Sequence, residues 1–163
     1  MFHRSVTLLA AVFCFGFAGN ADAQQSTTRL KGLEGANDAH VWQAVGRLDA
    51  GKTGFCTATL ISPEFVLTAA HCVYSSGTGE LLKAEDLTFR AGLRNGQASA
   101  ERGILQIEAH PRYRPSDGMS AENIRHDVAL LRLTRPIPTH ELDPFVLHNT
   151  RVTTGSVSIV SYG

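Results

Sequence analysis

Two residues of this chain have types and positions that suit acid–base chemistry. His71 follows a short apolar run and two alanines, and Asp127 comes 56 residues later, immediately before the apolar run Val128–Leu133. An imidazole that a carboxylate holds in one tautomer can take a proton from a hydroxyl group on its other side, which turns that hydroxyl into a nucleophile. An aspartate at the start of a strand can be partly buried and still reach the imidazole. His71 and Asp127 are therefore the candidates for such a pair, with His71 as the base and Asp127 as the group that orients it.

Each of these residues also has a simpler interpretation when it is taken alone. A histidine beside a cysteine is commonly a packed or solvated residue, and an aspartate before an apolar run commonly begins a strand without any chemistry. A separation of 56 residues does not decide between these interpretations. Chemistry is favoured because two segments that resemble segments of one enzyme family occur together in this chain. They are Leu67-Thr68-Ala69-Ala70-His71-Cys72 and His126-Asp127-Val128-Ala129-Leu130-Leu131-Arg132-Leu133.

The elements that must position this pair are short apolar runs, which begin at His40 and are bounded by Gly, Pro, Asp or Asn. They are rich in Val, Ile, Leu, Phe and Thr, as strands are. We expect one helical turn over Ala69–Tyr74 and loops over Ser75–Glu85 and Arg112–Ile124. Six short strands with almost no helical periodicity indicate an all-β barrel or sandwich. The expected strands are Val41–Leu48, Phe55–Ile61, Phe65–Thr68, Leu87–Ala91, Ile104–Ala109 and Val128–Leu133.

The first 23 residues have the pattern of a cleaved secretory signal peptide. His3 and Arg4 form a short basic start, Val6–Ala18 is almost unbroken apolar sequence, and Ala21-Asp22-Ala23 fits a cleavage site. The apolar run of 13 residues is shorter than the roughly 20 that a membrane-spanning helix needs, although an uncleaved anchor is the alternative. We therefore expect a secreted or periplasmic protein with no membrane anchor after cleavage, whose residues 24–39 form a polar arm or propeptide.

Two cysteines, Cys56 and Cys72, remain after the expected signal peptide. An even number of cysteines in an exported chain predicts a disulfide, because the compartment is oxidising. In the chain-entropy treatment such a bridge stabilises the fold by roughly 3 kcal/mol, and it would pin the residue next to His71. Free thiols are one alternative. A metal site is the other, but two cysteines 16 apart without a nearby histidine pair do not match zinc-site spacing.

Other features of the sequence indicate no electrostatic partner and no cofactor. The 15 basic and 15 acidic residues balance to a net charge of zero, and no Lys/Arg run indicates a nucleic-acid or membrane-surface partner. The remaining histidines lack metal-site spacing, and neither a glycine-rich phosphate loop nor a calcium loop is found. We therefore expect no cofactor and no metal.

The segments around His71 and Asp127 resemble the histidine and aspartate segments of the trypsin/chymotrypsin-like serine proteases. The resemblance covers roughly residues 40–163, and Cys56 precedes the histidine segment as in that family. Flanking positions that also resemble the family are Ile61-Ser62-Pro63 and Arg135-Pro136-Ile137. The sequence most resembles bacterial exported members of the family at Trp42–Arg47, Phe55–Ile61 and Val160–Gly163.

The resemblance implies a two-barrel fold with the catalytic residues divided between the barrels. Residues 40–134 would form the first six-stranded antiparallel barrel, 135–155 a linker, and 156–163 the start of a second barrel that is largely absent. The first barrel would supply His71 as base and Asp127 as its partner, with Cys56 and Cys72 bridged. The second barrel of the family supplies the serine, the oxyanion-hole amides and the specificity pocket.

No serine of this chain lies in a Gly-x-Ser-x-Gly or Gly-x-Ser-Gly turn, so we expect the nucleophile to lie outside these 163 residues. No Ile/Val-Val/Ile-Gly-Gly start follows the basic residues Arg29 and Lys31, which leaves the mode of activation open. The expected function is serine-type endopeptidase action on protein or peptide substrates, represented by a fragment that is inactive alone. Two alternatives are a complete but degenerate product and a catalytically dead single-barrel binding or inhibitory module.

Overall fold

The computed structural model describes residues 32, 39–51, 54–150 and 153–162. The expected signal peptide and nearly all of the expected arm lie outside these residues. Contacts divide the chain into two units, residues 1–32 and 33–163, and the second unit contains every element described below. Its strands are β1 (Val45–Ala50), β2 (Phe55–Leu60), β3 (Phe65–Thr68), β4 (Leu87–Ala91), β5 (Ala100–Ala109) and β6 (Ala129–Leu133).

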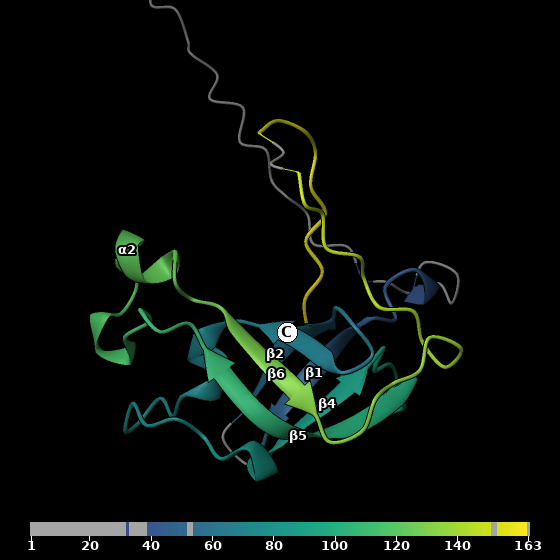
Figure 1. The fold of residues 1–163 in the computed structure, drawn as a ribbon, viewed down its shortest axis with the longest axis horizontal. Coiled ribbons are helices and arrows are strands. Elements are labelled where there is room, and N and C mark those ends of the chain that lie inside the picture. Colours follow the sequence, from purple (N-terminus) through teal and green to yellow (C-terminus); the bar gives the residue numbers. More distant parts are fainter. Residues whose placement is uncertain (1–31, 33–38, 52–53, 151–152, 163) are drawn as a thin grey trace, which may run out of the picture. The chain divides into compact units, whose positions relative to one another are not determined.

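The six strands form one closed barrel in the order β1-β2-β3-β6-β5-β4, and every neighbouring pair is antiparallel (Figure 1). The barrel closes where β4 pairs with β1. This confirms the prediction of an all-β fold with a six-stranded antiparallel barrel. Closure leaves none of these six strands as an unpaired edge, which removes the usual template for edge-to-edge aggregation.

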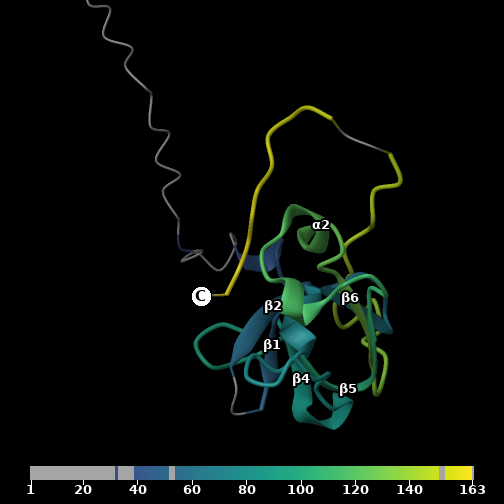
Figure 2. The same cartoon turned by 90° about the vertical axis from the view of Figure 1, so that its left-hand side faces the viewer.

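Short helical elements connect the strands. The 3-10 turn η1 (Ala70–Val73) follows β3 directly, as the sequence predicted for Ala69–Tyr74. Two more 3-10 turns, η2 (Ala84–Asp86) and η3 (Pro115–Asp117), and the four-residue helix α2 (Ala121–Ile124) lie in the segments that were expected to be loops. In both views α2 lies outside the ring of strands (Figure 2).

Strand periodicity accounts for the core of the barrel. In β4, Leu87, Phe89 and Ala91 are buried while the residues between them are half-buried, because successive strand side chains point to opposite faces. Gly46 of β1 lies where a Cβ atom would come within 2.5 Å of both the Arg90 carbonyl oxygen and the Phe89 ring. Only glycine allows β1 and β4 to approach this closely.

Two strands begin four residues away from their predicted starts, and the other boundaries that differ do so by one or two residues. The first strand begins at Val45 instead of Val41, because a turn precedes it in which the Trp42 amide donates to the Ala39 carbonyl at 3.0 Å. The fifth strand begins at Ala100 instead of Ile104. Its first four residues lack β-branched side chains, but they pair with β4, from Ala100 opposite Ala91 onward. Pairing therefore overrides the weak local strand propensity.

The segment after β6 packs partly on the barrel. Ile137 and Leu142 are buried in the core cluster, and the Phe145 amide donates to the Leu60 carbonyl at 2.9 Å. Further on, where residues 156–163 were expected to begin a second barrel, the described residues form no strand. The Tyr162 amide donates to the Thr57 hydroxyl oxygen at 2.8 Å. The boundaries proposed for a linker and a second barrel stay predictions.

Among the described residues, no helix has both the length and the apolar character that crossing a membrane requires.

Candidate active site

His71 lies on η1, immediately after β3. The turn is held by its own backbone, since the Cys72 amide donates to the Ala69 carbonyl at 3.2 Å and the Tyr74 amide to the His71 carbonyl at 3.3 Å. Ala70 and Val73 within the turn are fully buried, which anchors it to the core. The His71 side chain between them is 61 % exposed, so its ring projects from a fixed base toward solvent.

Asp127 lies between α2 and β6. Its amide donates to the Ile124 carbonyl at 3.2 Å, and the next residue but one, Ala129, begins β6 opposite Thr68 of β3. His71 comes three residues after the end of β3, and Asp127 comes two residues before the start of β6. The register therefore places these two residues beside each other. The pairing of two strands far apart in the sequence thus brings His71 and Asp127 together.

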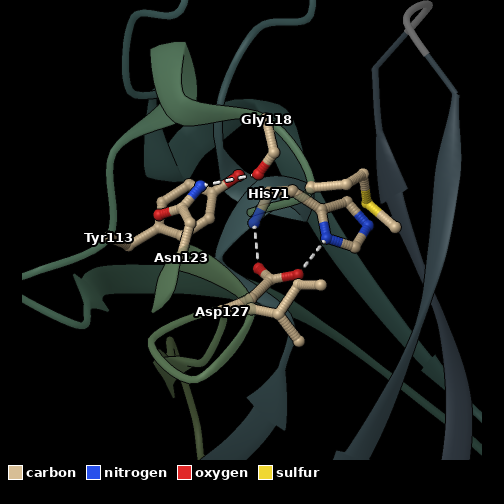
Figure 3. Close-up of a pocket in the computed structure, with 7 residues that line it drawn as sticks. His71, Tyr113, Gly118, Asn123 and Asp127 are labelled. Carbon is tan, nitrogen blue, oxygen red and sulfur yellow. Dashed lines mark hydrogen bonds and ion pairs between the residues drawn. The ribbon is translucent and has the colours of Figure 1, made fainter. Parts of the chain in front are cut away.

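The Asp127 carboxylate contacts His71 at two points (Figure 3). One oxygen, Oδ1, accepts from the backbone amide of His71 at 2.8 Å, and the other, Oδ2, lies 2.7 Å from the ring Nδ1. An ionised carboxylate can only accept hydrogen bonds, so the proton at this contact belongs to Nδ1. The neutral ring then has its lone pair on Nε2. This is the tautomer that a general base acting through Nε2 requires.

The predicted disulfide between Cys56 and Cys72 is confirmed, with Cα atoms 6.0 Å apart. It connects η1 to β2 and so fixes the turn that carries His71. Potential metal ligands of Cys56, His71 and Cys72 lie within 4.8 Å of one another, the one such group found among the described residues. In the disulfide neither sulfur is a thiolate, so the oxidised chain lacks the ligands that zinc needs there.

No sequence pattern marked Asn123, which organises the loop before Asp127. Its side chain is nearly fully buried and makes three hydrogen bonds. Oδ1 accepts from the Arg114 amide at 2.9 Å, while Nδ2 donates to the carbonyls of Arg114 at 2.8 Å and Gly118 at 2.9 Å. The Asn123 carbonyl in turn accepts from the His126 amide at 3.0 Å. Asn123 therefore holds Arg114 and Gly118 through its side chain, and His126, the residue before Asp127, through its backbone carbonyl.

A pocket of about 210 Å³ opens beside the His71 ring and the Asp127 carboxylate. Its other walls include the buried Tyr113 and two exposed apolar side chains, Met119 and Ile124. Burial raises the pKa of the Tyr113 phenol, and the negative charge of Asp127 raises it further. Because Met119 and Ile124 are apolar, the pocket can receive an apolar group directly next to the imidazole.

Two pairs of aromatic rings pack together in the described part of the chain. Trp42 meets Phe145 edge-on, with ring centroids 5.8 Å apart. His126, beside Asp127, stacks on His110 at 4.6 Å. Neither contact reaches the His71 ring.

Several serine hydroxyls among the described residues form hydrogen bonds with residues close to them in the sequence. Ser62 and Ser75 accept amide hydrogens within turns, and Ser120 accepts from the Asn123 amide at the start of α2. Among the described residues, His71 has no hydrogen bond from a serine hydroxyl. The described residues therefore contain a hydrogen-bonded pair of imidazole and carboxylate.

Comparison with protein families matches residues 30–163 to the family described as Trypsin. Among curated proteins, "Kallikrein-15" of Saguinus oedipus is 33% identical over 146 residues, covering 89% of this chain and 52% of that protein. "Serine protease SP24D" of Anopheles gambiae is 32% identical over 112 residues, 68% of this chain and 38% of that protein. "Serine protease 7" of Drosophila melanogaster is 33% identical over 122 residues, covering 65% of this chain and 30% of that protein.

The chain thus spans between about a third and a half of the length of these relatives. The family match covers the barrel and both residues of the His71–Asp127 pair. On this match, the chain belongs to the trypsin family of serine proteases.

Proposed function

We propose that this chain provides the general base and its orienting carboxylate to a serine-type endopeptidase. The observation that carries the proposal is the double contact of Asp127 with the amide and the ring of His71. It fixes both the direction of the ring and its tautomer, and it leaves Nε2 free to take a proton. The family to which the chain belongs supports a Ser-His-Asp triad.

The reaction would proceed by acyl transfer. Nε2 of His71 takes the proton of a serine hydroxyl as the serine oxygen attacks the carbonyl carbon of a peptide bond. The imidazolium that forms is stabilised by the Asp127 carboxylate 2.7 Å away, and it then gives its proton to the leaving amine. Water, activated by the same imidazole, hydrolyses the acyl-enzyme. The substrates are proteins or peptides, and the pocket beside His71 holds an apolar group of the substrate.

The nucleophilic serine lies outside the 163 residues in this proposal. Two observations support this: the sequence has no Gly-x-Ser-x-Gly turn, and no serine hydroxyl among the described residues bonds to His71. The chain alone is then inactive, and a second barrel supplies the serine and the oxyanion hole.

A fluorophosphonate probe, which labels only activated serines, tests this proposal. We expect no labelling of the 163-residue chain, and labelling of the protein that includes the downstream reading frame. The His71→Ala variant of that longer protein should lose the label, whereas His140→Ala, an exposed histidine, should keep it. Labelling of the 163-residue chain would place the serine within it. A stop codon immediately after Gly163 would contradict the protease function and favour a single-barrel binding or inhibitory module.

Export is part of the same proposal. The pattern of residues 1–23 supports a secreted or periplasmic location, and the wording of Trp42–Arg47 supports a bacterial exported type, whereas the relatives named above come from insects and mammals. N-terminal sequencing of the protein recovered outside the cytoplasm should give Gln24 as the first residue. Recovery of uncleaved protein from the cytoplasm would contradict export.

A further inference from the structure

Three groups that are good zinc ligands meet at the turn that carries His71. Ligand atoms of Cys56, His71 and Cys72 all lie within 4.8 Å of one another. In the structure the two sulfurs are bonded to each other, so only the imidazole can bind a metal. The chemistry of the point therefore depends on the oxidation state of the disulfide.

We propose that reduction of the Cys56–Cys72 disulfide converts this point into a Zn²⁺ site made of two thiolates and the His71 imidazole. A dithiol reductant gives two electrons and two protons to the disulfide and becomes a disulfide itself, leaving two cysteine thiols. Binding of Zn²⁺ then displaces the two thiol protons, which pass to water. The metal site stands independently of the proposed protease function, and only its effect on catalysis rests on that function.

The distances suit the metal. Zinc binds thiolate at about 2.3 Å and imidazole at about 2.0 Å in a tetrahedral arrangement, so bound sulfurs lie roughly 3.8 Å apart. The two sulfurs and one nitrogen of the His71 ring lie within 4.8 Å of one another, a limit that is wide enough to contain such a cluster. Water would complete the fourth position.

Contacts other than the disulfide hold the three ligands in place. Cys56 lies within β2, opposite Leu48 of β1. The Cys72 amide donates to the Ala69 carbonyl at 3.2 Å, and the His71 amide donates to Asp127 at 2.8 Å. Because both backbones are fixed by the barrel and by η1, breaking the sulfur–sulfur bond leaves the sulfurs near each other.

Asp127 selects the nitrogen that would bind the metal. Its Oδ2 accepts the Nδ1 hydrogen of His71 at 2.7 Å, which leaves the Nε2 lone pair available. A metal-bound histidine whose other nitrogen donates to a carboxylate is a common arrangement in zinc sites. The ring is 61 % exposed, so hydrated Zn²⁺ can reach it. Since catalysis needs the same lone pair, a bound Zn²⁺ would block the base.

The test compares metal binding by the oxidised and reduced 163-residue chain. The chain is reduced with dithiothreitol, freed of it by anaerobic gel filtration, and titrated with Zn²⁺ against a chromophoric chelator. We expect one Zn²⁺ per reduced chain and none per oxidised chain. Titration with Co²⁺ should produce a thiolate-to-cobalt absorption band in the reduced chain alone. Equal binding by the two forms, or no binding by either, would overturn the proposal.

Two variants separate a folded site from thiols of an unfolded chain. His71→Ala should lower the affinity of the reduced chain for Zn²⁺ roughly tenfold or more, since it removes one of three ligands. Asp127→Asn should lower it roughly 10- to 100-fold, because the carboxylate orients the ring. His140→Ala, in an exposed position, should have no effect. Zinc binding that is insensitive to Asp127→Asn would show that thiols alone bind the metal, and the proposal would be wrong.

Discussion

The backbone amide and the ring of His71 both donate to Asp127, at 2.8 Å through Oδ1 and 2.7 Å through Oδ2. The two contacts together orient the carboxylate as well as the imidazole. If only the ring bond existed, the carboxylate could rotate while keeping it. The amide contact assigns one oxygen to the backbone and so reserves the other for Nδ1.

This division of the two oxygens predicts the effect of Asp127→Asn. The His71 amide still needs an acceptor, so the Asn oxygen faces the backbone and its NH₂ group faces Nδ1. The ring must then carry its proton on Nε2, which is the wrong tautomer for a base. We expect the nitrogen-15 NMR shifts of the His71 ring to show this exchange in the 163-residue chain.

In the complete protease the same variant should lose roughly 10²- to 10⁴-fold in kcat/KM, the usual contribution of general-base catalysis. Asp143→Asn, which changes an exposed carboxylate, is the matched control and should leave both readouts unchanged. An unaltered His71 tautomer in the Asp127→Asn variant would show that the carboxylate does not set it.

Asn123→Ala should destabilise the chain by about 1–3 kcal/mol, because it leaves the part-buried amide and carbonyl of Arg114 and the Gly118 carbonyl without their partner. Urea unfolding of the 163-residue chain measures the change. The control Asn149→Ala removes an exposed side chain and should change the free energy of unfolding by no more than about 0.5 kcal/mol. Equal effects of the two substitutions would mean that the Asn123 bonds do not hold the loop.

Gly46→Ala should destabilise the barrel by roughly 1–3 kcal/mol or more, because the new Cβ lies 2.5 Å from the Arg90 carbonyl oxygen and from the Phe89 ring. The obstacle includes backbone, which cannot move without disturbing the β1–β4 ladder. Gly77→Ala is the control, since nothing lies within 4 Å of its Cβ position. Thermal unfolding of both variants should show a lower midpoint for Gly46→Ala alone.

Tyr113 should make the chain sensitive to alkaline pH. Burial, with the charge of Asp127, raises the pKa of Tyr113 above its usual value near 10, so the folded chain retains the phenol proton to a higher pH than the unfolded chain does. The associated stability is fully present below pH 10 and is lost as the pH rises through the folded pKa. Tyr113→Phe should remove this alkaline loss. The free energy of unfolding of the variant, measured with urea, should therefore rise relative to that of the parent chain above about pH 10. A difference that is constant between pH 8 and pH 11 would contradict the assignment to Tyr113.

The sequence was sufficient to predict the elements whose side-chain patterns are local. All six strands were predicted, because each contains a run of apolar or β-branched residues bounded by turn residues. The helical turn at His71 followed from the small residues before it. The disulfide was predicted from the even number of cysteines in an exported chain, and the partnership of His71 with Asp127 from the resemblance to a protease family. The structure brings each pair into contact.

The features that were missed depend on partners distant in the sequence. Ala100 begins a strand only because β4 is beside it, and Ile137 is buried because the barrel is there to receive it. Asn123 was unremarkable in a loop of small and polar residues. Its importance comes from three hydrogen bonds to backbone that another segment positions, and no local pattern encodes them.

The pairing of β3 with β6 has a consequence for the order of events during folding. Thr68 and Ala129 are opposite each other in this pairing, although about 60 residues separate them, and contacts of such long range form late and slowly in β proteins. His71 and Asp127 extend the same pairing beyond the strand ends. A newly made chain therefore has no oriented His71 ring until β3 has met β6. The contact between His71 and Asp127 thus serves as a report that these two strands have paired.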